Sequence, residues 1–195
     1  LNTIVLAGGT PVLVDVEPGT YNMDVTKIEK AVTKRTRAIM PVHFAGLPVD
    51  LDPLYDIAKR HKLRVIEDAA HAPGAGAPGQ MAGAIGDAGC FSFFSNKNLV
   101  TGEGGMVTCN DESLWSRMWS FKDHGKSWDA VYNRSHPPGY RWLHESFGTN
   151  WRMLEMQSAI GRIQLGRMED WTARRTEIAR RLSEAMTPFT GLVRV

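Results

Sequence analysis

Short apolar runs alternate with amphipathic segments along the first half of the chain. The runs that predict strands span residues 12–16, 38–42, 64–68, 88–94 and 106–109. Helical spacing predicts helices over residues 2–7 and 24–32, and a third that has Asp52 as N-cap and Pro53 at its first position and ends near residue 63. Because the later strands are apolar almost throughout, both faces of their sheet should be buried. This order of elements predicts an α/β fold, a three-layer sandwich with a mainly parallel sheet.

The pattern changes after residue 120. Residues 121–149 show no regular spacing of apolar positions, although five of the six tryptophans lie between Trp115 and Trp151. A segment this long within a compact domain usually has a function or is disordered, and the tryptophans argue against disorder. We expect it to pack on the sheet or on a second subunit, with direct substrate binding as the alternative. Beyond it, Asn150 is predicted to cap one long helix that runs to about residue 187.

Composition and charge describe an ordinary globular domain, with 43% hydrophobic and 23% charged residues. The net charge of +2 is too small to indicate a nucleic-acid partner. Cys90 and Cys109 lie in apolar runs, which we interpret as buried thiols in a reducing compartment. Since no apolar stretch approaches the roughly 18 residues of a membrane span and no signal-peptide pattern opens the chain, we expect a cytoplasmic protein without a membrane partner.

Lys97 is the main candidate for chemistry. It lies in a Gly-rich turn after an apolar strand, and Asp68 ends an earlier strand. A lysine amine in such a place can hold an aldehyde cofactor as a Schiff base. Pyridoxal phosphate also needs a carboxylate beside its protonated ring nitrogen, for which Asp68 is the candidate, and a phosphate-binding group, for which Ser92 is the candidate. Taken alone, Lys97 is more typical of a surface turn than of a cofactor site, and Asp68 is equally typical of a helix or turn cap.

Two other patterns carry less weight. Residues 74–79 match the Gly-x-Gly-x-x-Gly fingerprint of nucleotide binding, but no clear helix follows and no acidic residue stands in the right context, so we interpret them as a flexible loop. The alternative hypothesis of an NAD-dependent oxidoreductase rests on this pattern alone, and titration with NAD would test it. The spacing of His43, Asp68 and His71 matches no zinc site, so we expect no metal.

Several linked motifs resemble the DegT-type sugar aminotransferases, which are fold-type I pyridoxal phosphate enzymes of the aspartate aminotransferase superfamily. They are Pro18-Gly-Thr-Tyr-Asn22, Pro41-Val-His-Phe-Ala-Gly46, Val65-Ile-Glu-Asp68-Ala-Ala-His71, Gly86-Asp-Ala-Gly-Cys-Phe-Ser92-Phe-Phe-Ser-Asn-Lys97-Asn-Leu, Gly102-Glu-Gly-Gly-Met-Val-Thr108, Asn150-Trp-Arg-Met153 and Gln157-Ser-Ala-Ile-Gly161. They occur in the family's order and extend over almost the whole chain.

The resemblance implies a role for each matching residue. Lys97 would form the internal aldimine with pyridoxal 5′-phosphate and shuttle the substrate proton, and Asp68 would pair with the pyridine nitrogen. His71 would lie near the ring hydroxyl of the cofactor, and Ser92 would bind its phosphate. Asn150 would reach the phosphate of a partner subunit, with Arg152 beside it in a less defined role. These roles imply a homodimer with a shared active site.

The resemblance also implies a domain organisation. Residues 1–149 would be the central part of the cofactor-binding large domain, 150–187 a long helix leading towards the small domain, and 188–195 its first residues. Family members also carry an N-terminal segment with a phosphate-binding Gly-Thr turn and a residue that stacks on the cofactor ring, and a C-terminal small domain. Because the chain opens on Leu1 and ends in a strand-like run, we expect it to be the middle of a longer protein.

The implied function is transfer of an amino group, from glutamate, to a keto group on a nucleotide-linked sugar for polysaccharide or antibiotic-sugar synthesis. Related sugar dehydratases carry histidine in place of the lysine, so Lys97 favours transamination over dehydration. A non-catalytic regulatory homologue that retains the cofactor pocket is the remaining alternative. Stacking of a nucleotide base on Trp128 or Trp142 is a further hypothesis for the tryptophan-rich segment.

Overall fold

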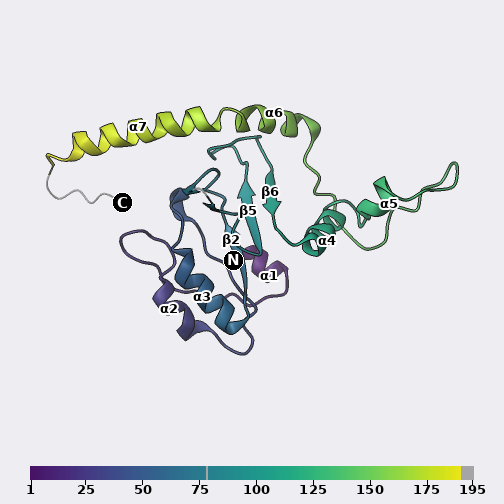
Figure 1. Cartoon of the computed structure of the whole chain (residues 1–195), viewed down its shortest axis with the longest axis horizontal. Coiled ribbons are helices and arrows are strands. Elements are labelled where there is room, and N and C mark those ends of the chain that lie inside the picture. Colours follow the sequence, from purple (N-terminus) through teal and green to yellow (C-terminus); the bar gives the residue numbers. More distant parts are fainter. Residues whose placement is uncertain (78, 190–195) are drawn as a thin grey trace.

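The computed structural model describes residues 1–77 and 79–189 and contains a central four-stranded sheet with the order β1-β2-β5-β6 (Figure 1). The strands are β1 (Ala38–Ile39), β2 (Arg64–Asp68), β5 (Ala88–Ser92) and β6 (Gly105–Thr108). β1 is parallel to β2 and β2 to β5, whereas β6 is antiparallel to β5. The predicted α/β class with a mainly parallel sheet is confirmed.

Helices α2 (Val25–Ala31) and α3 (Leu51–His61) bury their apolar sides against one face of this sheet. Leu54, Ile57 and Ala58 recur at helical spacing on α3 and are all buried. They form the main core with these residues of α2, the strands and the connecting loop: Ile28, Ile39, Val49 and Val65. Because side chains alternate along a strand, this face of β2 also carries Glu67, and Asp68 projects from the opposite face.

The start of α3 differs from the prediction. The helix begins at Leu51 with Asp50 as its N-cap, so Asp52 and Pro53 lie inside the first turn. Proline is tolerated there because the first N–H groups of a helix have no intrahelical acceptor. The N-cap of α2 is Asp24, as predicted, and its side chain accepts a hydrogen bond from Thr26 N–H at 3.0 Å.

Two other short segments also differ from prediction. Residues 12–16 form no strand: only Val16 makes a bridge, to Met23, and Val12 and Leu13 are exposed. Among the described residues, no neighbouring strand pairs with this apolar segment. The glycine-rich segment forms a short antiparallel pair, β3 (Gly76–Ala77) and β4 (Gln80–Met81), rather than an irregular loop. α1 (Asn2–Leu6) is present where a helix was predicted.

The second half of the chain is mainly helical. It contains α4 (Glu112–Lys122), α5 (Trp128–Tyr132), α6 (Glu155–Leu165) and α7 (Met168–Met186), with α6 and α7 end to end along one side of the molecule (Figure 1). The single helix predicted from Asn150 is wrong in two respects. α6 has Leu154 as its N-cap, and the helix is interrupted at residues 166–167 between α6 and α7. Gln157 Oε1 accepts a hydrogen bond from Leu154 N–H at 3.1 Å, which favours the later start. The predicted start of a small domain lies mostly outside the described residues.

No helix in the described part of the chain combines the length and the apolar character needed to cross a lipid bilayer.

Candidate active site

Lys97 lies on a closed loop between β5 and β6. The ends of the loop are joined by hydrogen bonds from Phe93 N–H to the Gly104 carbonyl at 2.8 Å and from Thr101 N–H to the Phe93 carbonyl at 2.9 Å. Within it, Lys97 N–H donates to the Phe94 carbonyl at 3.0 Å, which closes a turn around the lysine. The lysine is half-buried. The loop therefore holds an amine just beyond the carboxyl end of a central strand.

α6 supports the base of this loop. Leu99 is 4% exposed and Thr101 is 5% exposed, so the loop has a small buried base of its own. Val100 N–H donates to the Gln164 side chain on α6 at 2.8 Å. Gly161 allows the close approach, because a Cβ atom there would lie 3.0 Å from the Thr101 methyl group. The Lys97 loop is thus attached to the helix as well as to the sheet.

Asp68 lies at the carboxyl end of β2, in register with Cys90 on β5. Paired residues of neighbouring strands share a face, so Asp68, Cys90 and Ser92 all project from the face opposite α3. Burial raises the pKa of the Cys90 thiol, and the negative charge of Asp68 raises it further. Asp68 Oδ1 accepts a hydrogen bond from Ala70 N–H at 3.1 Å, and within residues 1–77 and 79–189 no group donates to Oδ2. One carboxylate oxygen is therefore free for a ligand.

Ser92 and His71 complete the predicted group at this edge of the sheet. Ser92 is the last residue of β5, where it pairs with Gly105, and its hydroxyl has one long contact, from Phe94 N–H at 3.4 Å. His71 follows Asp68 by three residues and is exposed, with its ring 6.4 Å from the ring of Phe44. The structure therefore gathers Asp68, His71, Ser92 and Lys97 at the carboxyl ends of adjacent strands, where α/β sheets bind ligands.

Asn150 lies in a different cluster. It forms an antiparallel bridge with Asp123, and its side-chain oxygen accepts a hydrogen bond from Arg152 Nε at 3.2 Å. Arg152 Nε is also 3.3 Å from the Asp123 carboxylate. Burial alone would raise the pKa of Asp123, but Lys126, Arg152 and a further lysine outweigh it and lower that pKa. Asn150 is exposed and, within residues 1–77 and 79–189, makes no hydrogen bond to the other predicted site residues, so its role across an interface stays a prediction.

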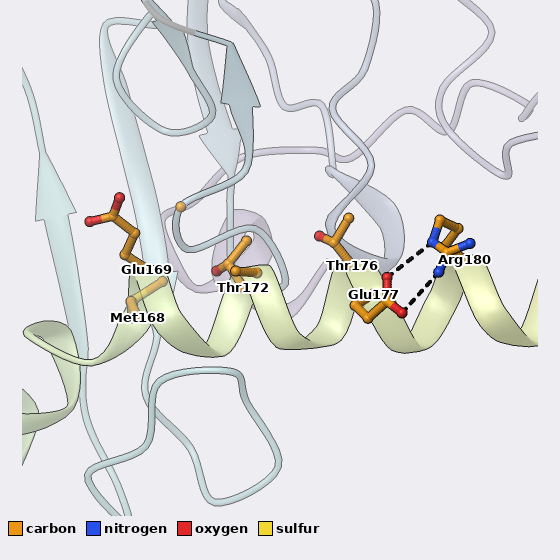
Figure 2. A pocket seen from close by; sticks show the side chains of 8 residues that line it. Met168, Glu169, Thr172, Thr176, Glu177 and Arg180 are labelled. Atoms are coloured by element: carbon orange, nitrogen blue, oxygen red, sulfur yellow. Dashed lines mark hydrogen bonds and ion pairs between the residues drawn. The ribbon is translucent and has the colours of Figure 1, made fainter.

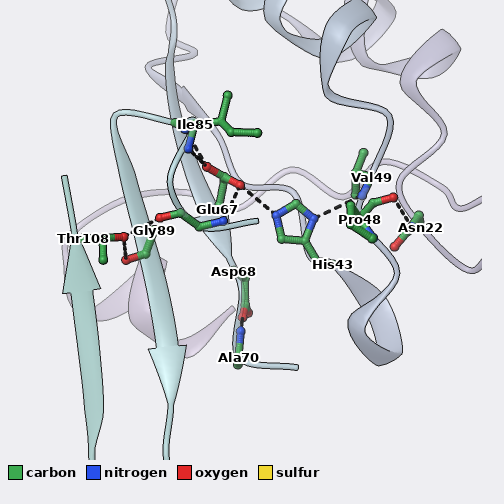
Figure 3. Close-up of polar contacts among 12 residues, drawn as sticks. Asn22, His43, Pro48, Val49, Glu67, Asp68, Ala70, Ile85, Gly89 and Thr108 are labelled. Carbon is green, nitrogen blue, oxygen red and sulfur yellow. Dashed lines mark hydrogen bonds and ion pairs between the residues drawn. The ribbon is translucent and has the colours of Figure 1, made fainter. Parts of the chain in front are cut away.

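The structure contains a second polar group that sequence reasoning missed, the buried pair of Glu67 and His43 (Figure 3). Both side chains are 0% exposed, and His43 Nε2 lies 2.9 Å from Glu67 Oε2. Oε2 also accepts from Gly83 N–H at 2.7 Å, and Oε1 accepts from Ile85 N–H at 2.9 Å and Gly86 N–H at 2.5 Å. The signal available in the sequence was a glutamate within the apolar run of β2.

These hydrogen bonds determine the ionisation of Glu67. Burial raises the pKa of a carboxyl group because it disfavours the charged form. For Glu67 the donors His43, Gly86, Gly83 and Ile85 outweigh this effect and lower the pKa to about 2. Glu67 is therefore a fully hydrogen-bonded carboxylate, directly before Asp68 in the chain.

An open groove of about 680 Å³ runs between α7 and the turn at Gly74 (Figure 2). Met168, Thr172 and Thr176 line it, and Glu177 and Arg180 form an ion pair at 2.9 Å beside it. None of the predicted site residues lines this groove. We therefore assign the candidate active site to the strand ends and not to this groove.

Comparison with known proteins gives the family. The sequence pattern of the DegT/DnrJ/EryC1/StrS aminotransferase family matches residues 1–195. The chain belongs to this family. Its aminotransferases use pyridoxal phosphate, and the structures that resemble this chain are fold-type I enzymes, as predicted.

Three proteins illustrate the similarity. The spore coat polysaccharide biosynthesis protein SpsC of Bacillus subtilis is 44% identical over 194 residues, which are 98% of this chain and 49% of SpsC. The GDP-perosamine synthase of Caulobacter vibrioides is 44% identical over 177 residues, which are 91% of this chain and 45% of the synthase. The X-ray structure of the aminotransferase from Psychrobacter cryohalolentis is 52% identical, with a TM-score of 0.93 over 96% of this chain and 48% of that one. The chain spans about half the length of the curated relatives it matches.

The residues present fit pyridoxal phosphate. The cofactor needs an amine, a carboxylate with a free oxygen and a phosphate-binding hydroxyl close together, and Lys97, Asp68 Oδ2 and Ser92 supply these groups at one sheet edge. Gly102 and Gly104 in the Lys97 loop have φ values of +85° and +145°, which side-chain-bearing residues rarely adopt. The donor set is that of a site for a phosphorylated aldehyde.

Proposed function

We propose that the complete protein is a pyridoxal phosphate-dependent aminotransferase that moves an amino group from glutamate to a keto group of a nucleotide-linked sugar. The observation that carries the proposal is Lys97, half-buried on a closed loop just beyond the end of β5, the strand that pairs with the strand ending at Asp68. When bound, the cofactor supplies an electron sink for the substrate carbon that loses a proton. The protein must then hold the cofactor, keep its ring nitrogen protonated and move the substrate proton.

We propose a residue for each of these tasks. Lys97 Nζ would be the amine that holds the cofactor and would carry the proton to and from the substrate carbon. Asp68 Oδ2 would accept a hydrogen bond from the protonated ring nitrogen, while Oδ1 stays bound to Ala70 N–H. The Ser92 hydroxyl would bind the phosphate, and His71 would form a hydrogen bond with the ring hydroxyl. The hydrogen bonds that close the loop hold the backbone of Lys97 just beyond the end of β5.

A sugar substrate is supported by the relatives rather than by a pocket in this chain. SpsC is named for polysaccharide biosynthesis, and GDP-perosamine synthase for a product that carries a nucleotide. Stacking of a nucleotide base on Trp128 is disfavoured, because Trp128 already packs on Trp119 and Tyr132, with ring centroids 5.2 Å and 4.2 Å away. Trp142 also contacts one ring, that of Tyr140 with centroids 4.4 Å apart, but it is 67% exposed and is the better candidate for stacking on a nucleotide base.

We also propose that the active unit is a homodimer in the cytoplasm, with Asn150 reaching the phosphate of the partner's cofactor. Exposed apolar side chains around Asn150 support this interface. Phe147 is 99% exposed and Trp151 is 70% exposed, and a second subunit would remove both from water. Cys90 and Cys109 are half-buried, whereas full burial was predicted. Both are free thiols, which are typical of proteins in a reducing compartment.

Borohydride trapping tests the proposed attachment. The complete gene product, loaded with pyridoxal phosphate and reduced with borohydride, should carry the cofactor on the peptide that contains Lys97. Mass spectrometry identifies that peptide. Lys97→Ala should give no adduct and reduce transamination of keto-sugar nucleotides by at least about a thousandfold, the loss typical of a removed covalent group. Lys122→Ala is the control, since Lys122 stacks on Trp119 away from the loop.

Three outcomes would contradict the proposal. An adduct on another lysine would refute the assignment of Lys97. Cofactor binding without transfer from glutamate to any keto-sugar nucleotide would favour the regulatory homologue. Release of water from the sugar without transfer of an amino group would favour the dehydratase.

A further inference from the structure

The backbone of Asp68 is held from one side by the segment that precedes η1 (Phe44–Gly46). Asp68 N–H donates to the Pro41 carbonyl at 2.8 Å, and His43 N–H donates to the Asp68 carbonyl at 3.1 Å. These two bonds flank the bridge between Val42 and Asp68. The position of the Asp68 backbone therefore depends on where residues 41–43 lie, because both its N–H and its carbonyl are bonded to them.

The ring of His43 is fixed through both of its nitrogens. Nδ1 accepts a hydrogen bond from Val49 N–H at 3.1 Å, so this nitrogen carries no proton. Nε2 then carries the proton and donates to Glu67 Oε2 at 2.9 Å. His43 is thus a neutral imidazole with one orientation, and its ring ties residues 41–43 to the side chain of Glu67.

Glu67 in turn is anchored to the turn before β5. Three backbone N–H groups of residues 83–86 donate to its carboxylate, so together with His43 all of its bonds go to rigid backbone or to a fixed ring. The turn packs closely against β2, because a Cβ atom at Gly86 would lie 2.8 Å from the Val65 carbonyl and 3.2 Å from Glu67 Oε1. One chain of contacts therefore runs from this turn through Glu67 and His43 to the backbone of Asp68.

The direction of the side chains separates this pair from the site itself. Successive side chains of a strand point to opposite faces, so Glu67 projects towards α3 and Asp68 towards the proposed cofactor. Glu67 and His43, both wholly buried, act on the far side of the sheet. Any effect on the cofactor must pass through the backbone of Asp68.

We propose that Glu67 and His43 are positioning residues that hold Asp68 so that its free oxygen Oδ2 meets the ring nitrogen of pyridoxal phosphate. The inference rests on the function proposed above. Displacement of a supporting group by about 1 Å is enough to weaken a hydrogen bond of this kind severely. Loss of the pair should therefore lower the protonation of the ring nitrogen as well as the stability of the fold.

The test uses the complete protein loaded with pyridoxal phosphate labelled with ¹⁵N at the ring nitrogen. Glu67→Gln replaces one acceptor oxygen with a donor, and His43→Asn keeps an acceptor for Val49 N–H while it removes the donor to Glu67. Asp87→Asn is the matched control, because Asp87 accepts from Val65 N–H at 2.8 Å at the amino end of the same strand. Asp68→Asn shows the signal of a ring nitrogen without its partner.

We expect the ¹⁵N resonance of the wild type at the protonated position. Glu67→Gln and His43→Asn should shift it towards the unprotonated position and weaken pyridoxal phosphate binding by about tenfold, the lower end of what loss of a supporting group costs at metal sites. Asp87→Asn should change neither quantity, although it loses similar hydrogen bonds.

Three results would overturn the inference. One is an unshifted resonance with wild-type affinity in the folded variants. Another is failure of both variants to fold while Asp87→Asn folds, because the pair would then serve stability alone. If the wild type bound no pyridoxal phosphate, the proposed function would fail together with the inference, and this result is distinguishable because it appears before any variant is made.

Discussion

At the scale of the residue, Glu67 shows how a buried charge is made stable. An ionised carboxylate without partners would be costly in the interior, and removal of one partner from a buried pair is usually strongly destabilising. Here a neutral imidazole and three backbone N–H groups donate hydrogen bonds to the two oxygens of the Glu67 carboxylate. The pair is therefore tolerated without an opposite charge. The adjacent Asp68 keeps one oxygen free, so two neighbouring carboxylates have different tasks.

Acid unfolding should reveal Glu67. Its pKa is about 2 in the folded protein against an ordinary value of 4.5, and this difference contributes about 3 kcal/mol to the free energy of unfolding, present above pH 4.5. The contribution is lost as the pH falls from about 4.5 towards 2, because the unfolded chain binds the proton first. Urea unfolding at pH 7 and pH 3 measures it, and Glu67→Gln should lose less stability between these pH values than the wild type. Equal losses in both proteins would contradict the prediction.

At the scale of the element, α6 matters because it supports the Lys97 loop. The helix has no fully buried residue, yet Gly161 and Gln164 both contact the loop. Gly161 lies three residues before Gln164, so the two share one face of the helix. Part of the support of the Lys97 loop therefore comes from a helix that begins more than fifty residues later in the chain.

Replacement of Gln164 tests this support. Gln164→Met keeps the helix but removes the acceptor for Val100 N–H, which should cost about 1 kcal/mol of stability. Amide hydrogen exchange at residues 99–101 should become faster, because the loop opens more easily. Gln80→Met is the control, since the Gln80 side chain has no hydrogen bond among those found in residues 1–77 and 79–189. Unchanged exchange at residues 99–101 would show that the sheet alone holds the loop.

At the scale of the whole molecule, much apolar surface lies in the second half of the chain. α6 and α7 expose Met156, Ile163 and Leu182, and the segment before α6 exposes Phe147 and Trp151. Solitary exposed apolar residues are normal, but this concentration is typical of surfaces that another subunit or domain covers. Asn150 lies within it, which agrees with the proposed homodimer.

A charge at this surface should separate the proposed subunits. Phe147→Asp places a carboxylate at a side chain that is 99% exposed, so it should leave the fold of the subunit intact and disfavour burial against a partner. Sedimentation velocity of the complete protein should show a shift from dimer to monomer, with weaker cofactor retention because Asn150 no longer reaches the partner. Leu6→Asp on α1, also highly exposed at 87%, is the matched control and should stay dimeric. A dimer that persists in Phe147→Asp would refute this interface.

Prediction from sequence succeeded where local pattern and packing agree. β2 runs from Arg64 to Asp68 as predicted, because its apolar pattern is bounded by polar residues, and Asp24 caps α2 because its side chain can reach a free N–H group. It failed where local signals competed or were weak. Asp52-Pro53 carries a strong helix-start signal, yet α3 begins at Leu51. α4 was missed altogether, because none of its residues is fully buried and its apolar periodicity is weak.

The sequence alone determined the α/β class and the main strands and supplied the candidate site residues, since apolar periodicity and motifs such as residues 92–97 are local. The resemblance gave the family, which comparison confirmed. Only the tertiary structure decided that Asp68 keeps a free oxygen, that α6 supports the Lys97 loop, and that Glu67 and His43 form a buried pair across 24 residues. These features depend on distances between segments far apart in the chain, and such distances follow from packing of the whole core rather than from any local pattern.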